Sequence, residues 1–368
     1  MRPRIAFPFI GGVHHVSHTM PVACALARRG DAEVTAFAAD APTQTTAAKI
    51  AADLGVAVSI ELLRRPQISD RLLGPHRSKL PLLWRNRKRL AKFDAILVPE
   101  RTSLVLQRMG VRQPRFINLP HGAGDRAISV DPRYRNFDRI LVAGPKTAER
   151  MAMNNIDPAS IRQVGYPKAE YLAGLSRPPI EGLEPGRPLI FYNPHFRRKL
   201  SSLDRAHDIV RTIGAATDAN LIVAPHIRSF MGASAAELER WHALAVPGRV
   251  VVDTGSPRMI DMSYVAAADL YVGDVSSQVY EFLLLGLRPC LFINAHDVAW
   301  EGDPSYRHWQ FGDVVSPQEA NQGVAAAFDR HARYLATQKA GVAETFARLE
   351  GSADRAADAI MEVVAERR

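Results

Sequence analysis

The stretch GDVSSQVYEFLLLGLRPCLF, from Gly273 to Phe292, decides the fold. An apolar strand at 269–272 runs into a polar turn, then an apolar helix, then a second strand after Arg288-Pro289. A strand, a crossover helix and a second strand predict parallel strands in an α/β domain. The turn offers Asp274, Ser276 and Ser277 at a strand end, before a helix whose first N–H groups are unpaired. Such a turn favours a phosphate.

Glu281 extends this pattern into the helix. It lies four residues beyond Ser277, about one helical turn, where its carboxylate can accept hydrogen bonds from a diol. A phosphate seat with a diol acceptor nearby suits a nucleotide. The alternative is structural: Asp274 or Ser276 caps a buried helix and Glu281 lies on its exposed side.

Strands and helices alternate through both halves of the chain, which predicts parallel sheets covered on both faces. In the first half, the expected strands are 5–10, 33–38, 56–62, 95–98, 115–119 and 139–142. In the second half they are 189–192, 220–223, 249–252, 270–272 and 289–293. We therefore expect an α/β protein with two doubly wound, Rossmann-like domains, and ligands of such sheets bind at the carboxyl ends of the strands.

A run rich in proline and glycine, 176–188, separates the halves and predicts a hinge linker. The expected domains are an acceptor-binding domain at 1–175 and a nucleotide-donor-binding domain at 189–345. The chain from Pro317 onward is expected to be helical, and its last part, 346–368, to form a helix that packs across the hinge. Two such domains can present their strand ends to one another across a cleft.

Composition narrows the function classes. The chain has 368 residues, 47% of them hydrophobic, which is enough for two full cores. We expect a cytoplasmic protein, because no apolar run approaches the roughly 20 residues that span a bilayer and no signal-peptide pattern precedes the first strand. The two cysteines, Cys24 and Cys290, lie in apolar surroundings and indicate neither a disulfide framework nor a cysteine metal site.

The formal charge of +9 is concentrated between Arg64 and Lys92, where ten cations accompany the single acid Asp70. Leucines and Trp84 are interleaved with this charge. Such a stretch is typical of peripheral contact with an anionic membrane, and a solvated basic loop and helix is the alternative. Nucleic acid is not expected as a partner, because no nucleic-acid-binding motif accompanies the charge.

After the first strand, paired glycines and three histidines precede a helix and form a candidate acceptor-binding loop. Its residues are Gly11, Gly12, His14, His15 and His18. Three imidazoles also raise zinc as an alternative, but the spacing matches no standard site, so no metal is predicted.

Histidines follow three further strands. His121 stands on a stiff Pro-His-Gly turn, which suits a general base, although a histidine that only caps a turn is the alternative. In the second half, the imidazole and guanidinium groups can neutralise a diphosphate, unless these loops are merely solvated. Those residues are Asn193, His195, Arg197, His226 and Arg228.

These motifs together resemble the CDP-glycerol glycerophosphotransferase family over about 115–315. The matching elements are Pro120-His121-Gly122, Val164-Gly165-Tyr166-Pro167, Tyr192-Asn193-Pro194, Pro225-His226, and Asp274-Val275-Ser276-Ser277 with Glu281 through Pro289. The resemblance implies the GT-B architecture of two facing Rossmann-like domains. It also implies synthesis of teichoic-acid-type or capsular polymers at the cytoplasmic face of the membrane, with a nucleotide-activated, CDP-linked donor and no cofactor.

The resemblance also implies roles for residues. His121 matches the family's base, and His226 its phosphate-contacting histidine. Ser276 and Ser277 match the hydroxyl pair at the donor phosphates, and Glu281 matches the carboxylate beside the ribose. His195-Phe196-Arg197 and Ala224-Pro225-His226-Ile227 depart from the family's usual patterns, which puts the transferred group in doubt.

Three alternatives stay open. The first is a GT-B glycosyltransferase that uses a nucleotide sugar. The others are a sugar-nucleotide 2-epimerase and a non-catalytic homologue. The acceptor, the donor base and the oligomeric state do not follow from the sequence.

Overall fold

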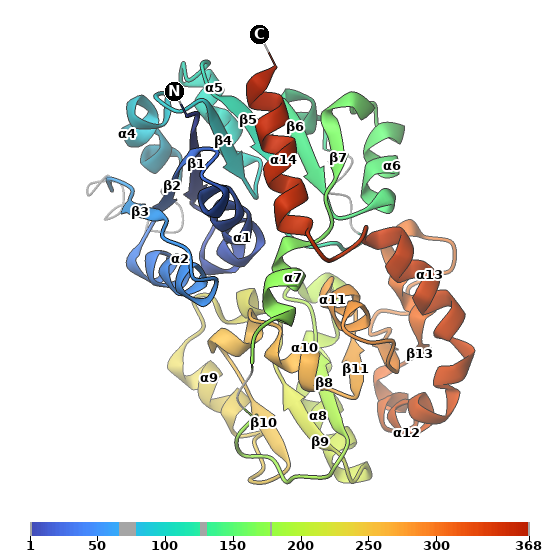
Figure 1. Ribbon diagram of the computed structural model, residues 1–368. Coiled ribbons are helices and arrows are strands. Elements are labelled where there is room, and N and C mark those ends of the chain that lie inside the picture. Colours follow the sequence, from blue (N-terminus) through green and yellow to red (C-terminus); the bar gives the residue numbers. More distant parts are fainter. Residues whose placement is uncertain (1, 66–78, 126–130, 177–178, 367–368) are drawn as a thin grey trace. The chain divides into compact units, whose positions relative to one another are not determined.

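Parallel strands form both sheets of this protein, shown as a computed structural model in Figure 1. The structure describes residues 2–65, 79–125, 131–176 and 179–366. One sheet has seven strands in the order β3-β2-β1-β4-β5-β6-β7, and the other has six in the order β10-β9-β8-β11-β12-β13. Neighbouring strands are parallel throughout both sheets. The predicted α/β class with two doubly wound sheets is confirmed.

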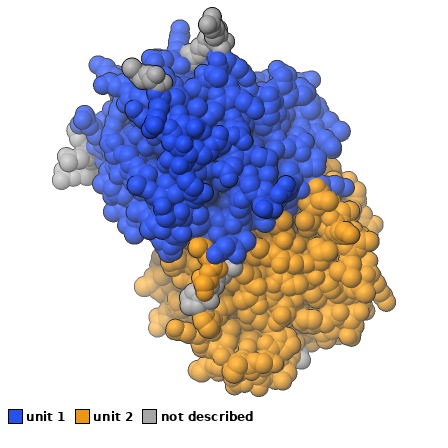
Figure 2. Space-filling view, in the orientation of Figure 1, with its two compact units in different colours: residues 1–121, 128–174, 344–368 blue, residues 122–127, 175–343 orange. Residues whose placement is uncertain are grey.

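The chain divides into two compact units (Figure 2). Unit 1 comprises Met1–His121, Ile128–Gly174 and Glu344–Arg368, and unit 2 comprises Gly122–Ala127 and Leu175–Ala343. The short segment Gly122–Ala127 therefore belongs to unit 2, although the chain before and after it belongs to unit 1. No pattern in the sequence indicated this insertion.

Unit 1 contains the seven-stranded sheet. Its strands are β1 (Arg4–Phe9), β2 (Glu33–Ala38), β3 (Ser59–Leu62), β4 (Ala95–Val98), β5 (Arg115–Asn118), β6 (Arg139–Val142) and β7 (Ile161–Gln163). Its helices before residue 175 are α1 (Val13–Arg29), α2 (Ala41–Asp53), α4 (Lys79–Leu90), α5 (Val105–Arg108), α6 (Pro145–Met153) and α7 (Pro167–Ala173). Ile5 to Phe9 of β1 are all buried, as expected for a central strand that helices cover on both faces.

Unit 2 contains the six-stranded sheet. Its strands are β8 (Leu189–Asn193), β9 (Asn220–Val223), β10 (Val250–Val252), β11 (Leu270–Gly273), β12 (Cys290–Ile293) and β13 (Asp313–Val315). Its helices are α8 (Ala206–Ala216), α9 (Ala235–His242), α10 (Ser263–Ala267), α11 (Gln278–Leu284) and α12 (Ala320–Arg330). Helix α13 (Leu335–Thr345) crosses the boundary between the units. Strands β8, β9 and β11 contribute fully buried aliphatic and aromatic residues to the core.

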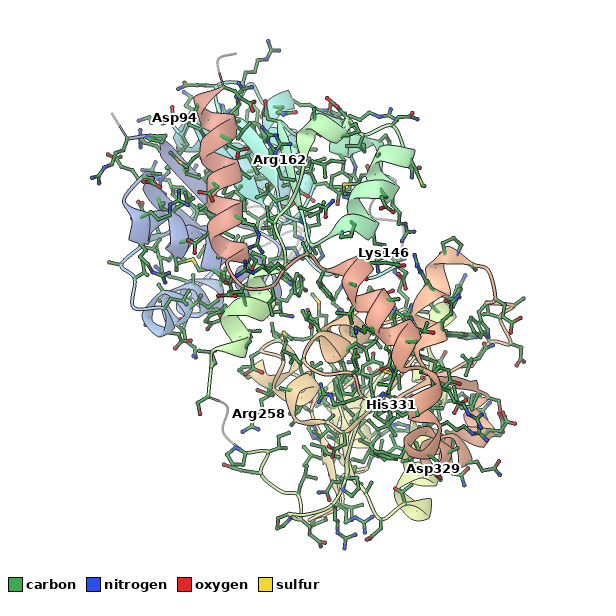
Figure 3. All side chains as sticks on the ribbon, turned by 45° about the vertical axis from the view of Figure 1, so that its right-hand side comes forward. Asp94, Lys146, Arg162, Arg258, Asp329 and His331 are labelled. Atoms are coloured by element: carbon green, nitrogen blue, oxygen red, sulfur yellow. The ribbon has the colours of Figure 1, made fainter. Side chains whose placement is uncertain are left out.

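The last helix, α14 (Ser352–Ala365), belongs to unit 1. It packs against α1, α7, β5 and β6. Ala356, Ile360 and Val363 form its buried stripe. At its exposed edge Glu362 lies 3.5 Å from Arg162, which is labelled in Figure 3. An apolar stripe with charged flanks explains why this terminal segment was predicted as a helix.

Candidate functional site

Several of the predicted site residues follow strands at the points where each sheet reverses its order, whereas His121 follows β5 and His226 follows β9. In unit 1 the reversal lies between β1 and β4, and in unit 2 it lies between β8 and β11. Ligands of doubly wound sheets bind outside the carboxyl ends of strands at such points. Gly11 to His18 follow β1, His195 follows β8, and Asp274 to Ser277 follow β11. Each unit therefore carries one group of candidates at the expected edge.

Four histidines gather in unit 1. The ring centroids of His15 and His121 lie 4.2 Å apart, and those of His14 and His15 also lie 4.2 Å apart. His121 is 6.1 Å from His14 and 6.2 Å from His18. The ring centroids of His18 and Tyr166 lie 5.7 Å apart. The structure thus brings the predicted base and the predicted acceptor loop into one cluster.

Two of these histidines are part of the core. His15 and His18 are only 5% and 6% exposed, whereas His14 is half-buried. Burial lowers the pKa of both His15 and His18 well below the usual value, and the neighbouring rings, with Lys168 beside His18, lower it further. Both imidazoles are therefore neutral at pH 7.

Gly11 makes room for this arrangement. A Cβ atom at position 11 would lie 1.9 Å from Nδ1 of His15, so only glycine lets that ring fold back over the loop. The sequence predicted that the glycines allow close approach of a ligand. The structure shows that Gly11 allows close approach of a histidine.

His121 is held in one tautomer. Its Nδ1 lies 3.0 Å from the carbonyl oxygen of Pro99, the residue after β4. A carbonyl oxygen only accepts, so Nδ1 carries the proton, and in the neutral ring Nε2 bears the basic lone pair. This is the arrangement that a general base requires.

The zinc alternative has no support in the geometry. Among the described residues, no group of three or more His, Cys, Asp or Glu side chains is placed to hold a metal ion. The four rings of the histidine cluster pack by their faces and edges.

In unit 2, the predicted phosphate-binding residues surround Phe196. The Phe196 ring lies 4.4 Å from the ring of His195 and 4.9 Å from that of His226. The guanidinium of Arg228 lies 4.2 Å from the Phe196 centroid, and that of Arg197 lies 5.7 Å away. Both arginines are exposed while the three rings are half-buried. Phe196 was not predicted to have a role, yet the basic side chains pack on its ring. We call Phe196 with His195, Arg197, His226 and Arg228 the Phe196 cluster.

Both histidines of this cluster also have a fixed tautomer. Nδ1 of His195 accepts a hydrogen bond from the backbone N–H of Arg197, and Nδ1 of His226 accepts one from the backbone N–H of Arg228, each at 3.2 Å. The proton of each neutral ring is therefore on Nε2. Two imidazole N–H donors and two guanidinium groups together form a surface suited to anionic oxygens.

The Asp274 carboxylate is used within unit 2. It accepts hydrogen bonds from the Ser201 hydroxyl at 2.8 Å and from the backbone N–H groups of Ser202, His195 and Val275 at 2.9, 2.9 and 2.6 Å. Burial raises the pKa of Asp274, and these hydrogen bonds oppose the rise. Asp274 therefore fixes the loops after β8 and β11 relative to each other.

Asn193 has a similar structural role at the end of β8. Its side-chain amide donates to the carbonyl oxygen of Ala224 at 2.7 Å, and its amide oxygen accepts from the Tyr271 hydroxyl at 3.3 Å. These bonds join β8, β9 and β11 where the strands end. Asn193 thus stabilises the carboxyl ends of the strands that precede the Phe196 cluster.

The three remaining donor-site candidates differ in accessibility. Ser277 is exposed, whereas Ser276 and Glu281 are buried, at 3% and 5% exposure. Ser277 packs against the inserted segment of unit 2, since a Cβ atom on Gly124 would lie 2.7 Å from the Ser277 Cβ. Gly122 has a φ of 81° and its Cβ position lies 3.5 Å from the Ser277 hydroxyl oxygen. Glycine at 124 permits this close packing, and glycine at 122 permits the positive φ.

Sequence reasoning missed a buried network beside this turn. Asp125 accepts hydrogen bonds from the Tyr280 hydroxyl at 2.6 Å and from the backbone N–H of His308 at 3.0 Å. The two ring nitrogens of His308 lie 2.9 Å from an Asp125 carboxylate oxygen and 2.8 Å from the carbonyl oxygen of Asp274. No sequence signal linked Asp125 to His308, which lies 183 residues further along the chain.

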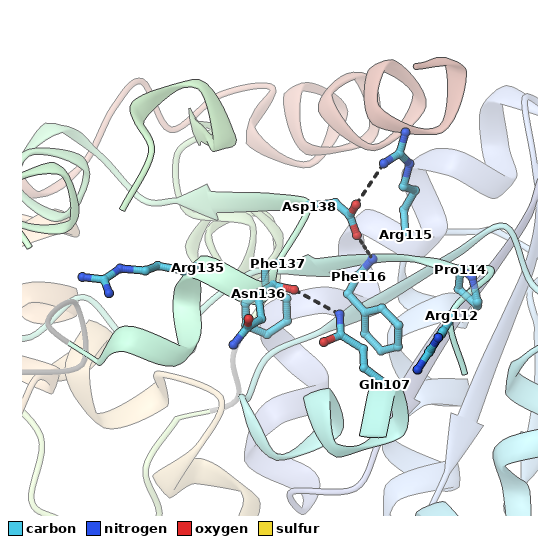
Figure 4. Close-up of a pocket in the computed structure, with 9 residues that line it drawn as sticks. All are labelled: Gln107, Arg112, Pro114, Arg115, Phe116, Arg135, Asn136, Phe137 and Asp138. Carbon is cyan, nitrogen blue, oxygen red and sulfur yellow. Dashed lines mark hydrogen bonds and ion pairs between the residues drawn. The ribbon is translucent and has the colours of Figure 1, made fainter. Parts of the chain in front are cut away.

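A hollow of about 380 Å³ opens elsewhere on unit 1 (Figure 4). Its lining includes Arg112, Arg115, Arg135 and Asp138, and none of the predicted site residues. Arg115 is the first residue of β5, so the hollow lies at the amino ends of the strands. Arg115 forms an ion pair with Asp138 at 3.0 Å, and Arg135 donates a hydrogen bond to a backbone carbonyl oxygen. Both guanidinium groups therefore have partners within the protein.

The basic stretch of unit 1 is described from Arg64 to Arg65 and from Lys79 onward, so the cations at 71 and 77 lie outside the described residues. Helix α4 buries Leu82, Leu83 and Leu90 and exposes Leu80 and Trp84, at 49% and 53%. None of the helices within the described ranges is both long and apolar enough to cross a bilayer.

The cations of α4 are not equivalent. The Arg87 guanidinium lies 3.6 Å from the centroid of the Trp84 ring. Arg89 pairs with Glu61 and lies 4.6 Å from the Phe37 ring. Arg85 and Lys88 are exposed to solvent. The latter two are therefore the cations of this helix best placed to meet an external anionic surface.

No family model matches the chain, and no curated protein sequence matches it. Solved structures do resemble it over its whole length. A protein from Listeria monocytogenes assigned as a UDP-N-acetylglucosamine 2-epimerase has a TM-score of 0.69 at 13% identity, covering 100% of this chain and 98% of its own.

Two transferases give similar agreement. The wall teichoic acid polymerase TagF, solved with CDPG, has a TM-score of 0.63 at 14% identity, covering 98% of this chain and 88% of its own. The calicheamicin glycosyltransferase CalG4 has a TM-score of 0.57 at 13% identity, covering 99% and 98%. At these identities the likeness concerns the fold, and it confirms that this chain has the GT-B fold, with a helix at its carboxyl end.

Proposed function

We propose that this protein is a GT-B transferase that moves glycerol phosphate, or a related group, from a CDP-activated donor to a hydroxyl of a glycan or lipid-linked acceptor. The product would belong to a cell-surface polymer. The observation that carries the proposal is the hydrogen bond from His121 Nδ1 to Pro99, which leaves Nε2 as the basic nitrogen. The similarity of fold to the teichoic acid polymerase supports the donor class.

In the proposed reaction, His121 Nε2 takes the proton of the acceptor hydroxyl. The acceptor oxygen attacks the β-phosphorus of CDP-glycerol, a new P–O bond forms, and the bond to the leaving CMP oxygen breaks. Negative charge grows on the departing nucleotide. General-base catalysis of this kind contributes about 10²- to 10⁴-fold.

The Phe196 cluster is the proposed site of charge stabilisation in unit 2. His226 and His195 offer Nε2–H donors, and Arg197 and Arg228 add two cations. Fixed donors and cations stabilise a developing anion without having to reorganise during the reaction. Ser276, Ser277 and Glu281 complete the proposed donor site. We propose that neither a metal nor a cofactor takes part.

A second candidate is a sugar-nucleotide 2-epimerase, which the TM-score of 0.69 with the Listeria protein favours. A third is a nucleotide-sugar glycosyltransferase, which the fold it shares with the glycosyltransferase CalG4 supports. His195-Phe196-Arg197 departs from the family's usual tryptophan-arginine, and the contacts of Phe196 place this change inside the basic cluster. The transferred group is thus the part of the proposal that most needs a direct test.

For the acceptor side, we propose peripheral contact with the anionic cytoplasmic face of the cell membrane through the basic stretch 64–92. The exposed Leu80, Trp84, Arg85 and Lys88 of α4 support this contact. An indole ring beside several cations is suited to the headgroup region of a bilayer.

One experiment separates these candidates. The melting temperature is measured with CDP, CMP, UDP, GDP and CDP-glycerol. The protein is then incubated with CDP-glycerol and acceptor, and separately with UDP-N-acetylglucosamine alone, while products are followed by mass spectrometry. Binding at 100 times Kd stabilises the folded state by about 2.7 kcal/mol. Stabilisation by cytidine nucleotides and release of CMP support the proposal. Conversion of UDP-N-acetylglucosamine to its epimer without any acceptor would replace it with the second candidate.

A further inference from the structure

The network around His308 lies in the core of unit 2 and has no role in the reaction described above. The side chains of Asp125 and His308 are 0% and 3% exposed. His308 Nδ1 lies 2.9 Å from Asp125 Oδ2, and Nε2 lies 2.8 Å from the carbonyl oxygen of Asp274. The two ring nitrogens thus face oxygen atoms that belong to two distant segments of unit 2.

These contacts favour one charge state of the ring. The Asp274 carbonyl oxygen can only accept, so Nε2 carries a proton. Asp125 Oδ2 already accepts the backbone N–H of His308 at 3.0 Å, and Oδ1 faces the Tyr280 hydroxyl at 2.6 Å. These two donors besides the ring favour an ionised Asp125 carboxylate, and an ionised carboxylate accepts from a proton on Nδ1.

The network joins two segments that pack against each other at Ser277. These are the turn that begins at Asp274 and the glycine-rich run that ends at Asp125. Asp274 begins the turn, and its carbonyl oxygen accepts from both His308 Nε2 and Trp309 Nε1, the latter at 2.7 Å. Asp125 ends the glycine-rich run, in which Gly124 packs so closely on Ser277 that a Cβ would lie 2.7 Å from the serine Cβ. His308 contacts both segments directly.

We propose that His308 is a buried imidazolium that positions the Asp274–Ser277 turn against the Gly122–Asp125 segment. The Asp125–His308 pair is internal to unit 2. The inference rests on the proposed function only where it treats the turn as part of the donor site. His308 is a positioning residue, because it acts on Ser277 through Asp274 and Asp125.

The charge is tested with the ring nitrogens themselves. In the full-length protein labelled with ¹⁵N-histidine, both His308 nitrogens should have shifts of protonated nitrogen at pH 7, and His308→Gln identifies the signals by their loss. In Asp125→Asn the carboxamide cannot balance an imidazolium, so His308 should show one unprotonated nitrogen. Tyr280→Phe is the matched control, because it removes one hydrogen bond of Asp125 but keeps the ion pair. A neutral His308 in the wild type would overturn the assignment of charge.

The positioning role is tested by nucleotide affinity, measured by calorimetry with the nucleotide that the wild type binds best. Losing a hydrogen bond to a charged group typically weakens an interaction about 10- to 100-fold, and His308→Gln and Asp125→Asn should weaken binding by that much. Unchanged affinity in either folded variant would overturn the role. If His308→Gln does not fold, the nearly isosteric Asp125→Asn decides.

Failure of the proposed function has a different outcome. A wild type that binds no nucleotide at all would refute the donor site. The positioning role would then be tested by comparing the amide ¹H and ¹⁵N chemical shifts around Ser277 in Asp125→Asn with those of the wild type. No change in those signals would overturn the positioning role independently of any ligand.

Discussion

The Nδ1 atom of His121 lies 3.0 Å from the carbonyl oxygen of Pro99, so the end of β4 determines which nitrogen of His121 is basic. The ring also packs 4.2 Å from the buried His15 ring, which limits its orientation. Tautomer and orientation are both set before any substrate arrives. Preorganisation of this kind suits the general base that we propose.

Replacing the His121 imidazole should therefore abolish turnover and leave the affinity for the donor nucleotide unchanged. For His121→Ala we expect kcat to fall about 10²- to 10⁴-fold with little change in nucleotide affinity by calorimetry. His242→Ala, which removes an exposed imidazole of unit 2, is the matched control and should keep full activity. Activity of His121→Ala within a few fold of the wild type would remove His121 from the mechanism.

Ser277 and Glu281 are predicted to contribute to donor binding. Ser277→Ala and Glu281→Ala should each weaken nucleotide binding, by about tenfold for the loss of one hydrogen bond. Ser234→Ala is a suitable control, since Ser234 caps α9 in the same unit and its loss should lower the free energy of unfolding by about 1 kcal/mol. Calorimetry that gives wild-type affinity for both site variants would refute this placement of the donor.

The buried histidines predict how stability depends on pH. The pKa of His15 and of His18 is lowered in the folded protein, mainly by burial, so below about pH 6.5 the unfolded chain binds more protons than the folded one. The free energy of unfolding should then decrease as pH falls, by up to about 1.4 kcal/mol per pH unit for each histidine.

Urea unfolding between pH 7.5 and 5.5 measures this dependence. His18→Phe keeps a ring beside Tyr166 but cannot titrate, so its free energy of unfolding should vary less with pH than that of the wild type. Identical pH dependence of the two proteins would mean that His18 is not neutral in the folded state.

Membrane contact is expected to depend on α4. Arg85 and Lys88 are exposed, and each cation near an anionic headgroup contributes about 1 kcal/mol. Arg85→Gln with Lys88→Gln should reduce sedimentation with anionic liposomes at low salt and leave nucleotide affinity unchanged. Lys49→Gln with Arg108→Gln removes the same charge from other exposed positions of unit 1 and should have a smaller effect. Equal losses in both double variants would indicate nonspecific charge attraction.

Most strands could be predicted because buried parallel strands appear as short apolar runs. The expectations for 95–98, 139–142 and 220–223 coincide with β4, β6 and β9. Strands β7 and β13 were missed, because each has three residues at the edge of its sheet and they include Arg162, Gln163 and Asp313. Short, partly polar edge strands take their conformation from pairing with a neighbour rather than from a local pattern.

The candidate site residues could be predicted only where polar or titratable side chains directly follow a strand in the sequence. His121, His195 and His226 stand on such turns, and the structure brings His121 to His15 and His195 to His226. The buried partners were not predictable. His308 lies on an irregular helical segment far from Asp125 in sequence, and its role comes from tertiary packing alone.

The assignment of α14 to unit 1 has a consequence for biosynthesis. A chain emerging from the ribosome exposes residues 175–343 before the helix that covers α1, α7, β5 and β6 has been made. Unit 2 can therefore complete its core first, whereas the core of unit 1 is complete only after Ser352 to Ala365 have been made. Until this helix has been made, the apolar surface that Ala356, Ile360 and Val363 will cover stays open to water and to chaperones.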